Sequence, residues 1–132
     1  MGAFQDYQLD ENSFNAESLK MTEKYTGLTF PMGSRGKNLF FRRSKCIDPS
    51  FIAKIEIPLA SINSFSEEIK NIKGTKITVT EGDPFEREVN WWGPNKAAII
   101  IEKYFYSQHG LVHVFLCQET EKFVLYIKWY CG

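Results

Sequence analysis

Four carboxylates lie close together in the segment Glu81-Gly82-Asp83-Pro84-Phe85-Glu86-Arg87-Glu88. Two carboxyl groups about 5–9 Å apart can serve as the acid and the base of glycoside hydrolysis. A dense acidic loop around a Gly-Asp-Pro turn is more typical of a solvated surface, whose negative field attracts a basic partner. We therefore interpret the acidic side chains as partner-binding rather than catalytic residues; they are Glu81, Asp83, Glu86 and Glu88.

Two adjacent tryptophans, Trp91 and Trp92, follow this acidic segment. Tryptophan is enriched among the residues that dominate binding energy at protein interfaces. Residues 86–92 are predicted to form a strand, in which neighbouring side chains point to opposite faces of the sheet. Both indoles can enter one core only if both faces are covered, so we assign the pair to the partner site. The alternative is that one indole belongs to the core and the other covers it.

The histidines and cysteines form no catalytic or metal-binding pattern. His113 and Cys117 share a face of one predicted strand, but four residues along a strand span roughly 13 Å, too far for a Cys–His nucleophile pair. His109 falls in a predicted turn. Without a Cys-x-x-Cys pair, a zinc or thioredoxin-type site is disfavoured. We expect no metal, no cofactor and reduced thiols, with a disulfide as the alternative in an exported chain; the cysteines are Cys46, Cys117 and Cys131.

One basic cluster lies within residues 34–45, where no acidic residue interrupts it and Phe40 and Phe41 are interleaved. Basic groups with aromatic rings can hold single-stranded nucleic acid. Residues 1–33, however, carry two basic and five acidic residues, which could neutralise the cluster within the chain. The whole chain balances 16 Lys and Arg against 16 Asp and Glu. We therefore expect no nucleic-acid partner; the cluster consists of Arg35, Lys37, Arg42, Arg43 and Lys45.

The elements that position these residues are predicted to be mostly strands. Alternation of apolar and charged residues is cleanest along 51–57, which Pro58 ends. Short polar links between the runs 97–106, 111–118 and 123–130 indicate a three-strand antiparallel meander. Further strands are predicted at 4–9, 37–45, 76–80 and 86–92.

Two helices are predicted. Residues 13–25 form a weak one, with Ser13 as a cap and Gly27 as its end. Residues 64–72 form an amphipathic one, in which Ser64 and Glu67 have the spacing of a capping box. The fold class is therefore α+β: a curved antiparallel sheet or partial barrel of about seven or eight strands, with one or two helices packed on it. With 132 residues, the chain fits a single domain, 1–132.

Targeting signals are lacking in this sequence. Its first residues have neither the basic nor the apolar region of a signal peptide, and no run of 18 apolar residues could span a membrane. We expect a cytoplasmic protein without a membrane span. The alternative is a periplasmic or lipid-anchored protein from which a leader has been removed. The oligomeric state is left open.

Several short segments occur in a recognisable order: Thr26-Gly27-Leu28-Thr29-Phe30-Pro31, then Asp48-Pro49-Ser50-Phe51-Ile52-Ala53-Lys54-Ile55, then Trp91-Trp92-Gly93-Pro94, then Val124-Leu125-Tyr126-Ile127-Lys128-Trp129. This order resembles small uncharacterised bacterial proteins, some of them lipoprotein-like. The resemblance covers roughly residues 20–130. It implies no activity and no functional residue, and its lipoprotein members favour the exported alternative.

In its general properties the chain is also similar to the immunity proteins of bacterial toxin systems, which are small, compact and without an active site. Our leading hypothesis is a non-enzymatic protein-binding module of this kind. It would cover the active site of a cognate toxin, for example a nuclease. The acidic residues of 81–88 would replace the phosphates of the toxin's substrate, and Trp91 or Trp92 would be the buried anchor.

Two alternatives belong to other functional classes. An enzyme could use His109 or His113 together with a carboxylate from elsewhere in the chain. A carrier of a small apolar ligand could enclose a pocket in the curved sheet. The residues expected to line that pocket are Tyr104, Phe105, Phe115, Phe123 and Trp129.

Overall fold

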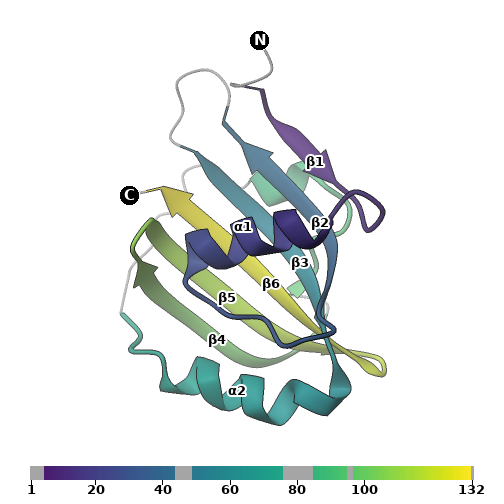
Figure 1. Cartoon of the computed structure of the whole chain (residues 1–132), viewed down its shortest axis with the longest axis vertical. Helices are drawn as coiled ribbons and strands as arrows, with labels where there is room; N and C mark the ends of the chain where they lie inside the picture. The colour runs from purple at the N-terminus through teal and green to yellow at the C-terminus, as the bar shows by residue number, and fades with distance from the viewer. Residues whose placement is uncertain (1–4, 44–48, 76–84, 95–96, 132) are drawn as a thin grey trace.

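The computed structural model describes residues 5–43, 49–75, 85–94 and 97–131 (Figure 1). The apolar alternation along 51–57 produces the strand β3 (Ser50–Ile57). The three runs predicted as a meander form β4 (Ala98–Ser107), β5 (Gly110–Glu119) and β6 (Lys122–Cys131). The remaining described strands are β1 (Tyr7–Leu9) and β2 (Arg35–Arg42). The α-helices are α1 (Ala16–Thr26) and α2 (Ile62–Asn71), and the short 3₁₀ turns are η2 (Leu59–Ser61) and η3 (Phe85–Glu88).

The described strands form one antiparallel sheet in the order β1-β2-β3-β6-β5-β4. After β3 the chain passes through α2 and enters the far edge of the sheet at β4. The predicted meander then returns to the centre, where β6 pairs with β3 along its whole length. The α+β class and the antiparallel sheet are confirmed. Two details are wrong: the described strands number six, and the sheet is open because its edge strands β1 and β4 do not pair.

The lower strand number has an identifiable source. Residues 86–92, predicted as a strand, form the turn η3 and irregular backbone instead. The side chains of this segment contact the face of the sheet below it, as described in the next subsection. The strand predicted at 76–80 lies outside the described residues.

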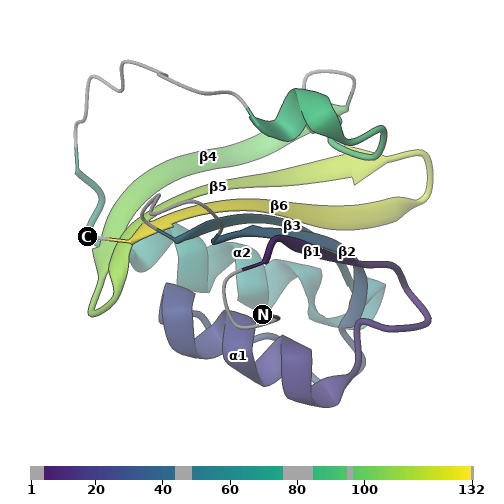
Figure 2. The ribbon, with the colours of Figure 1, turned by 90° about the horizontal axis from the view of Figure 1, so that it is seen from above.

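Both α-helices cover the same face of the sheet (Figure 2). The apolar stripe predicted for α2 buries Phe65 and Ile69 there. From α1, Tyr25 reaches the aromatic centre of this layer, with its ring centroid 4.8 Å from that of Trp129 and 6.3 Å from that of Phe51. Because alternate residues of every strand face the helices, this single layer holds the larger of the buried apolar clusters.

The helix ends differ from the predictions at their N-termini. Asn15 rather than Ser13 caps α1, its side-chain oxygen accepting a hydrogen bond from the backbone of Ser18. Gly27 ends that helix as predicted, in the left-handed conformation with φ of 75°. The capping box of α2 is wrong: the helix starts earlier, so Ser64 lies inside it and donates to the carbonyl of Ser61. The turn η2 at Leu59–Ser61 brings the chain into helical geometry before Ser64 is reached.

A lysine of the edge strand holds the C-terminus of α2 in place. The Nζ atom of Lys103 donates to the carbonyl oxygens of Ile69, Lys70 and Ile72 at 2.8, 2.7 and 2.7 Å. The last carbonyls of a helix have no partner within it and carry its partial negative charge, so an ammonium group there is doubly favourable. This contact ties the crossover helix to the strand that follows it.

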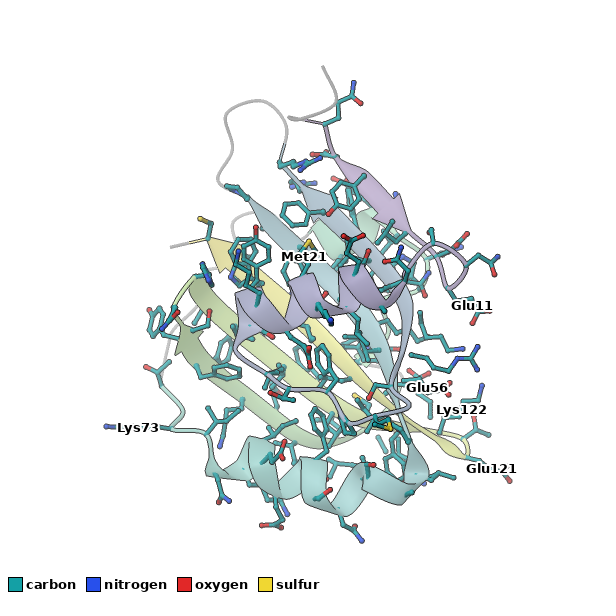
Figure 3. The ribbon with its side chains drawn as sticks, viewed as in Figure 1. Glu11, Met21, Glu56, Lys73, Glu121 and Lys122 are labelled. Atoms are coloured by element: carbon teal, nitrogen blue, oxygen red, sulfur yellow. The ribbon has the colours of Figure 1, made fainter. Side chains whose placement is uncertain are left out.

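We therefore expect Lys103→Met to lower the free energy of unfolding by about 1–3 kcal/mol, because it removes charge-assisted hydrogen bonds and leaves the carbonyls unpaired. Lys73→Met is the matched control, since Lys73 is an exposed lysine just beyond the same helix end and points outward (Figure 3). Urea denaturation of both variants measures the difference. Equal stability of the two variants would contradict the assigned role of Lys103.

Candidate functional site

The face of the sheet opposite the helices, which we call the outer face, carries polar and aromatic side chains. Cross-strand register places His113, Lys128, Ile52 and Phe40 in one row on it. Residues 85–94, which we call the strap, lie against this face (Figure 2). The sheet is therefore covered on both sides over part of its area, by helices on one and by the strap on the other.

Two carboxylates of the strap bind cations of the sheet. Glu86 accepts a hydrogen bond from Lys128 at 2.8 Å; the Lys128 side chain is buried, with 5% of its area exposed, and that of Glu86 is 14% exposed. Glu88, which is half exposed, pairs with the nearly buried Arg42. Two of the predicted partner-binding acids thus have cationic partners within the chain, which reduces their field outside it. Their contact with a partner stays a prediction; Glu81 and Asp83 lie outside the described residues.

The two tryptophans lie on the same side of the sheet, contrary to the prediction that they point to opposite faces. They do so because their segment is not a strand and does not alternate. Trp92 packs edge-to-face on Phe115 and Tyr126, with ring centroids 6.0 and 5.2 Å apart. Trp91 packs on Trp92 at 6.3 Å and joins the small apolar cluster around Phe40. Both indoles are partly buried, so each covers the sheet and keeps a part of its surface in solvent.

The ion pair beneath the strap gives a test of how the strap is held. Glu86→Gln should destabilise the chain by about 3 kcal/mol, because it withdraws the negative partner of a buried ammonium group. Combining it with Lys128→Met should cost less than the sum of the two single changes, and a double-mutant cycle measures that coupling.

The exposed pair formed by Glu67 and Lys70 is the control, since its side chains are 66% and 55% exposed. Lys70→Met should change the free energy of unfolding by less than about 1 kcal/mol. Additive effects of the Glu86 and Lys128 substitutions would contradict the pairing.

The enzymatic alternative expected a histidine beside a carboxylate, and one such pair is present. His113 Nε2 lies 2.8 Å from an oxygen of Glu102 on the adjacent strand. The imidazole is only 5% exposed, and its ring is 3.7 Å from the ring of Tyr104 and 4.1 Å from that of Phe115, measured between centroids. Enclosed in this way, the ring is oriented by its partners without being presented to solvent. His109 lies apart from this pair, against Tyr25 of α1.

The residues expected to line an apolar pocket do not face one another. Phe105, Phe123 and Trp129 belong to the helix-covered cluster. Phe115 lies on the outer face with Trp92, and Tyr104 stacks on His113 there. Because the sheet separates the two groups, these five residues cannot line a single cavity.

A network of polar side chains that had no sequence signal lies beside Trp92, near the C-terminal end of the strap. Tyr126 donates a short hydrogen bond to Glu119, and Lys54 Nζ lies 3.7 Å from the other oxygen of that carboxylate. The same ammonium group lies 5.7 Å from the centre of the Tyr126 ring. Burial and the negative charge of Glu119 raise the pKa of Tyr126 far above its usual range, so this phenol remains a hydrogen-bond donor.

Two hollows of the outer face meet at this network. The first, the charged hollow, has a volume of about 390 Å³ and is lined by lysines and carboxylates, among them Lys37, Lys122, Glu11 and Glu56. Figure 3 shows Glu56 and Lys122 beside each other at its rim. The second, the tryptophan hollow, has a volume of about 400 Å³ and lies between the strap and the β5–β6 turn. It is lined by Asn90, Trp91, Trp92, Gln118, Glu119 and Tyr126, among others.

The basic cluster predicted around β2 is distributed among partners within the chain. Arg42 pairs with Glu88, and Lys37 binds Glu11 at 2.8 Å. The Arg43 side chain donates to the backbone of Gln5 and lies 4.9 Å from the ring centre of Tyr7. Acidic residues of the N-terminal segment therefore neutralise part of the basic cluster, as their excess in residues 1–33 predicted. Lys45 lies outside the described residues.

No group of three or more His, Cys, Asp or Glu residues within the described ranges is arranged to hold a metal ion. Among the helices that the structure describes, none is long and apolar enough to cross a bilayer. Comparison with known proteins adds nothing to this description: no family model, curated protein or solved structure matches the chain.

Two cysteines differ sharply in environment. Cys117 is buried on the outer face, and burial together with the charges of Glu119 and Glu102 raises its pKa from 9.0 to about 11. Cys131 is exposed at the end of β6. Cys46 lies outside the described residues.

We expect iodoacetamide at pH 8 to alkylate Cys131 and to leave Cys117 unmodified until urea unfolds the chain, because alkylation requires an accessible thiolate. Since the folded-state pKa is raised, the stabilising contribution of the neutral Cys117 thiol is complete below pH 9 and is lost as the pH rises to about 11. Mass spectrometry of the separate peptides measures the modification. Equal rates at the two positions in the folded chain would refute this assignment.

Proposed function

We propose that the chain is a non-enzymatic protein-binding module, an immunity or inhibitor protein that covers the active site of a cognate bacterial toxin. The binding surface in this proposal is the strap with the tryptophan hollow beside it. The observation that carries it is the placement of Trp91 and Trp92, two partly exposed indoles fixed side by side on the outer face.

Preorganisation supports this assignment. Trp92 is held by Phe115 and Tyr126, and the strap is held by its Glu86 and Glu88 carboxylates, which bind Lys128 and Arg42 of the sheet. A side chain that is already fixed in the free protein loses little conformational entropy when a partner binds. In this proposal the strap carboxylates contribute to binding mainly by keeping the indoles in position, and the toxin is met by the aromatic and polar surface next to them.

The character of the surface supports binding over catalysis. The tryptophan hollow surrounds its indoles with charged and amide groups, and the charged hollow continues this polar surface beside it. A polar rim around an aromatic anchor is the composition of a protein interface. The His113–Glu102 pair, in contrast, has its ring enclosed between Tyr104 and Phe115. The alternative of a small-ligand carrier has no comparable support, because its expected lining is divided between the two faces of the sheet.

The proposal predicts a stable complex with the product of a gene next to the one for this chain. Co-expression should relieve that product's toxicity, and the purified complex should weaken roughly 30-fold in Kd on Trp91→Ala, which corresponds to about 2 kcal/mol. Growth assays and isothermal titration calorimetry measure the two effects.

Met32→Ala is the control, because Met32 is 97% exposed in the connection between α1 and β2 and lines neither hollow. It should leave the affinity unchanged. If no neighbouring gene product binds, or if the complex forms equally well with Trp91→Ala, the proposed function is wrong.

A further inference from the structure

The tryptophan hollow brings together aromatic, carboxylate and amide groups. Trp91 and Trp92 supply aromatic surface, Glu119 a carboxylate, and Asn90 and Gln118 amide groups. Lys54 also lines it, with its Nζ atom 3.7 Å from the Glu119 carboxylate. Aromatic faces and carboxylates both attract cations, and amide oxygens accept hydrogen bonds from N–H donors. The chemistry of the lining therefore favours a cationic group that also carries several donors.

Glu119 has acceptor capacity left for such a group. One of its oxygens accepts the hydroxyl of Tyr126, and the other lies 3.7 Å from Lys54 Nζ, too far for a hydrogen bond. A carboxylate offers about four lone-pair sites, so most of them are unused by these contacts. The side chain of Glu119 is 30% exposed, which leaves it accessible from solvent.

The chain itself gives an example of a cation on these rings. Lys128 Nζ lies 5.5 Å from the centre of the Trp92 ring, on the buried side of the strap. Guanidinium groups stack on aromatic rings and also form two parallel hydrogen bonds to a carboxylate, which an ammonium group cannot do. A guanidinium group could thus use the indole and carboxylate of this hollow at once.

The size and shape of the hollow indicate whether the cationic group belongs to a free small molecule or to a side chain of a protein. Its volume of about 400 Å³ is within the range of small-molecule sites, yet it lies open at the surface. Free small ligands are usually enclosed over most of their surface, whereas a side chain projecting from a protein needs only a recess for its end. A partner's arginine fits such a recess better than a free metabolite does.

We propose that the tryptophan hollow receives an arginine side chain of the protein partner, with its guanidinium group between the indoles and the Glu119 carboxylate. This rests on the proposed function for the identity of the partner, but the guanidinium site itself is a property of the free chain. Lys54, which contacts Glu119 only loosely, is displaced from the carboxylate when the guanidinium group binds.

The site is tested on the whole chain without any partner. N-acetyl-arginine amide should bind with a dissociation constant on the order of 1 mM, as expected for so small a ligand, and should change the tryptophan fluorescence saturably. N-acetyl-lysine amide should bind at least about 5-fold more weakly, because it lacks the fork of donors. NMR chemical-shift changes should centre on Trp91 and Glu119.

Two matched variants identify the carboxylate. Glu119→Gln should weaken arginine-amide binding at least about 10-fold, since it removes the charge of the paired oxygens. Glu121→Gln should leave it unchanged, because Glu121 lies two residues further along, in the β5–β6 turn, points outward from its tip and lines neither hollow (Figure 3). Thermal unfolding verifies that each variant is folded, and Trp91→Ala provides a second test of the site if Glu119→Gln is unstable.

Absence of saturable binding, equal binding of the lysine and arginine amides, or equal loss in the two glutamine variants would overturn this proposal. These outcomes are distinct from failure of the proposed function. If the arginine amide binds as expected but no product of a neighbouring gene binds the chain, the guanidinium site stands and the proposed function is wrong. If a toxin complex forms but is unaffected by Glu119→Gln, the proposed function stands and the partner's arginine does not occupy this hollow.

Discussion

The fold depends on covering the outer face of a sheet whose central strands bury apolar side chains on both faces and a lysine on the outer one. Ile52 and Val124 face away from the helices and are nonetheless buried, and Lys128 places an ammonium group among them. Exposing this area to water would lose apolar burial and leave the strap carboxylates unpaired. The strap meets both requirements with its indoles and its glutamates, so sheet and strap stabilise each other.

This arrangement assigns different tasks to residues that look alike in sequence. Glu86 and Glu88 were predicted from their density to act on a partner, yet their carboxylates are bound to Lys128 and Arg42. Glu119 is the last residue of β5, and register brings it to Tyr126 and Lys54, where the two hollows meet. Charge density alone therefore does not show which carboxylates meet a partner, because their ion pairs within the chain depend on the fold.

Sequence patterns predicted the meander, the α2 stripe and the α+β class because these depend on local periodicity and short links. The capping box at Ser64 and the strand at 86–92 failed because each pattern competed with a contact distant in sequence. Trp91 and Trp92 were assigned to a partner site from their residue type, which stays a prediction, whereas their common face could not be predicted without knowing that their segment lies across the sheet. The network around Glu119 had no sequence signal, since its members come from different strands and meet only through register.

The central claim is that the strap and the tryptophan hollow form the surface that a protein partner covers. Chemical-shift mapping of the isotope-labelled chain with the purified product of the neighbouring gene tests this most directly. We expect the largest changes to cluster at residues 88–93 and 118–120, over an interface of about 1,200–2,000 Å². Changes confined to the helices α1 and α2, with the indole signals of Trp91 and Trp92 unmoved, would contradict it.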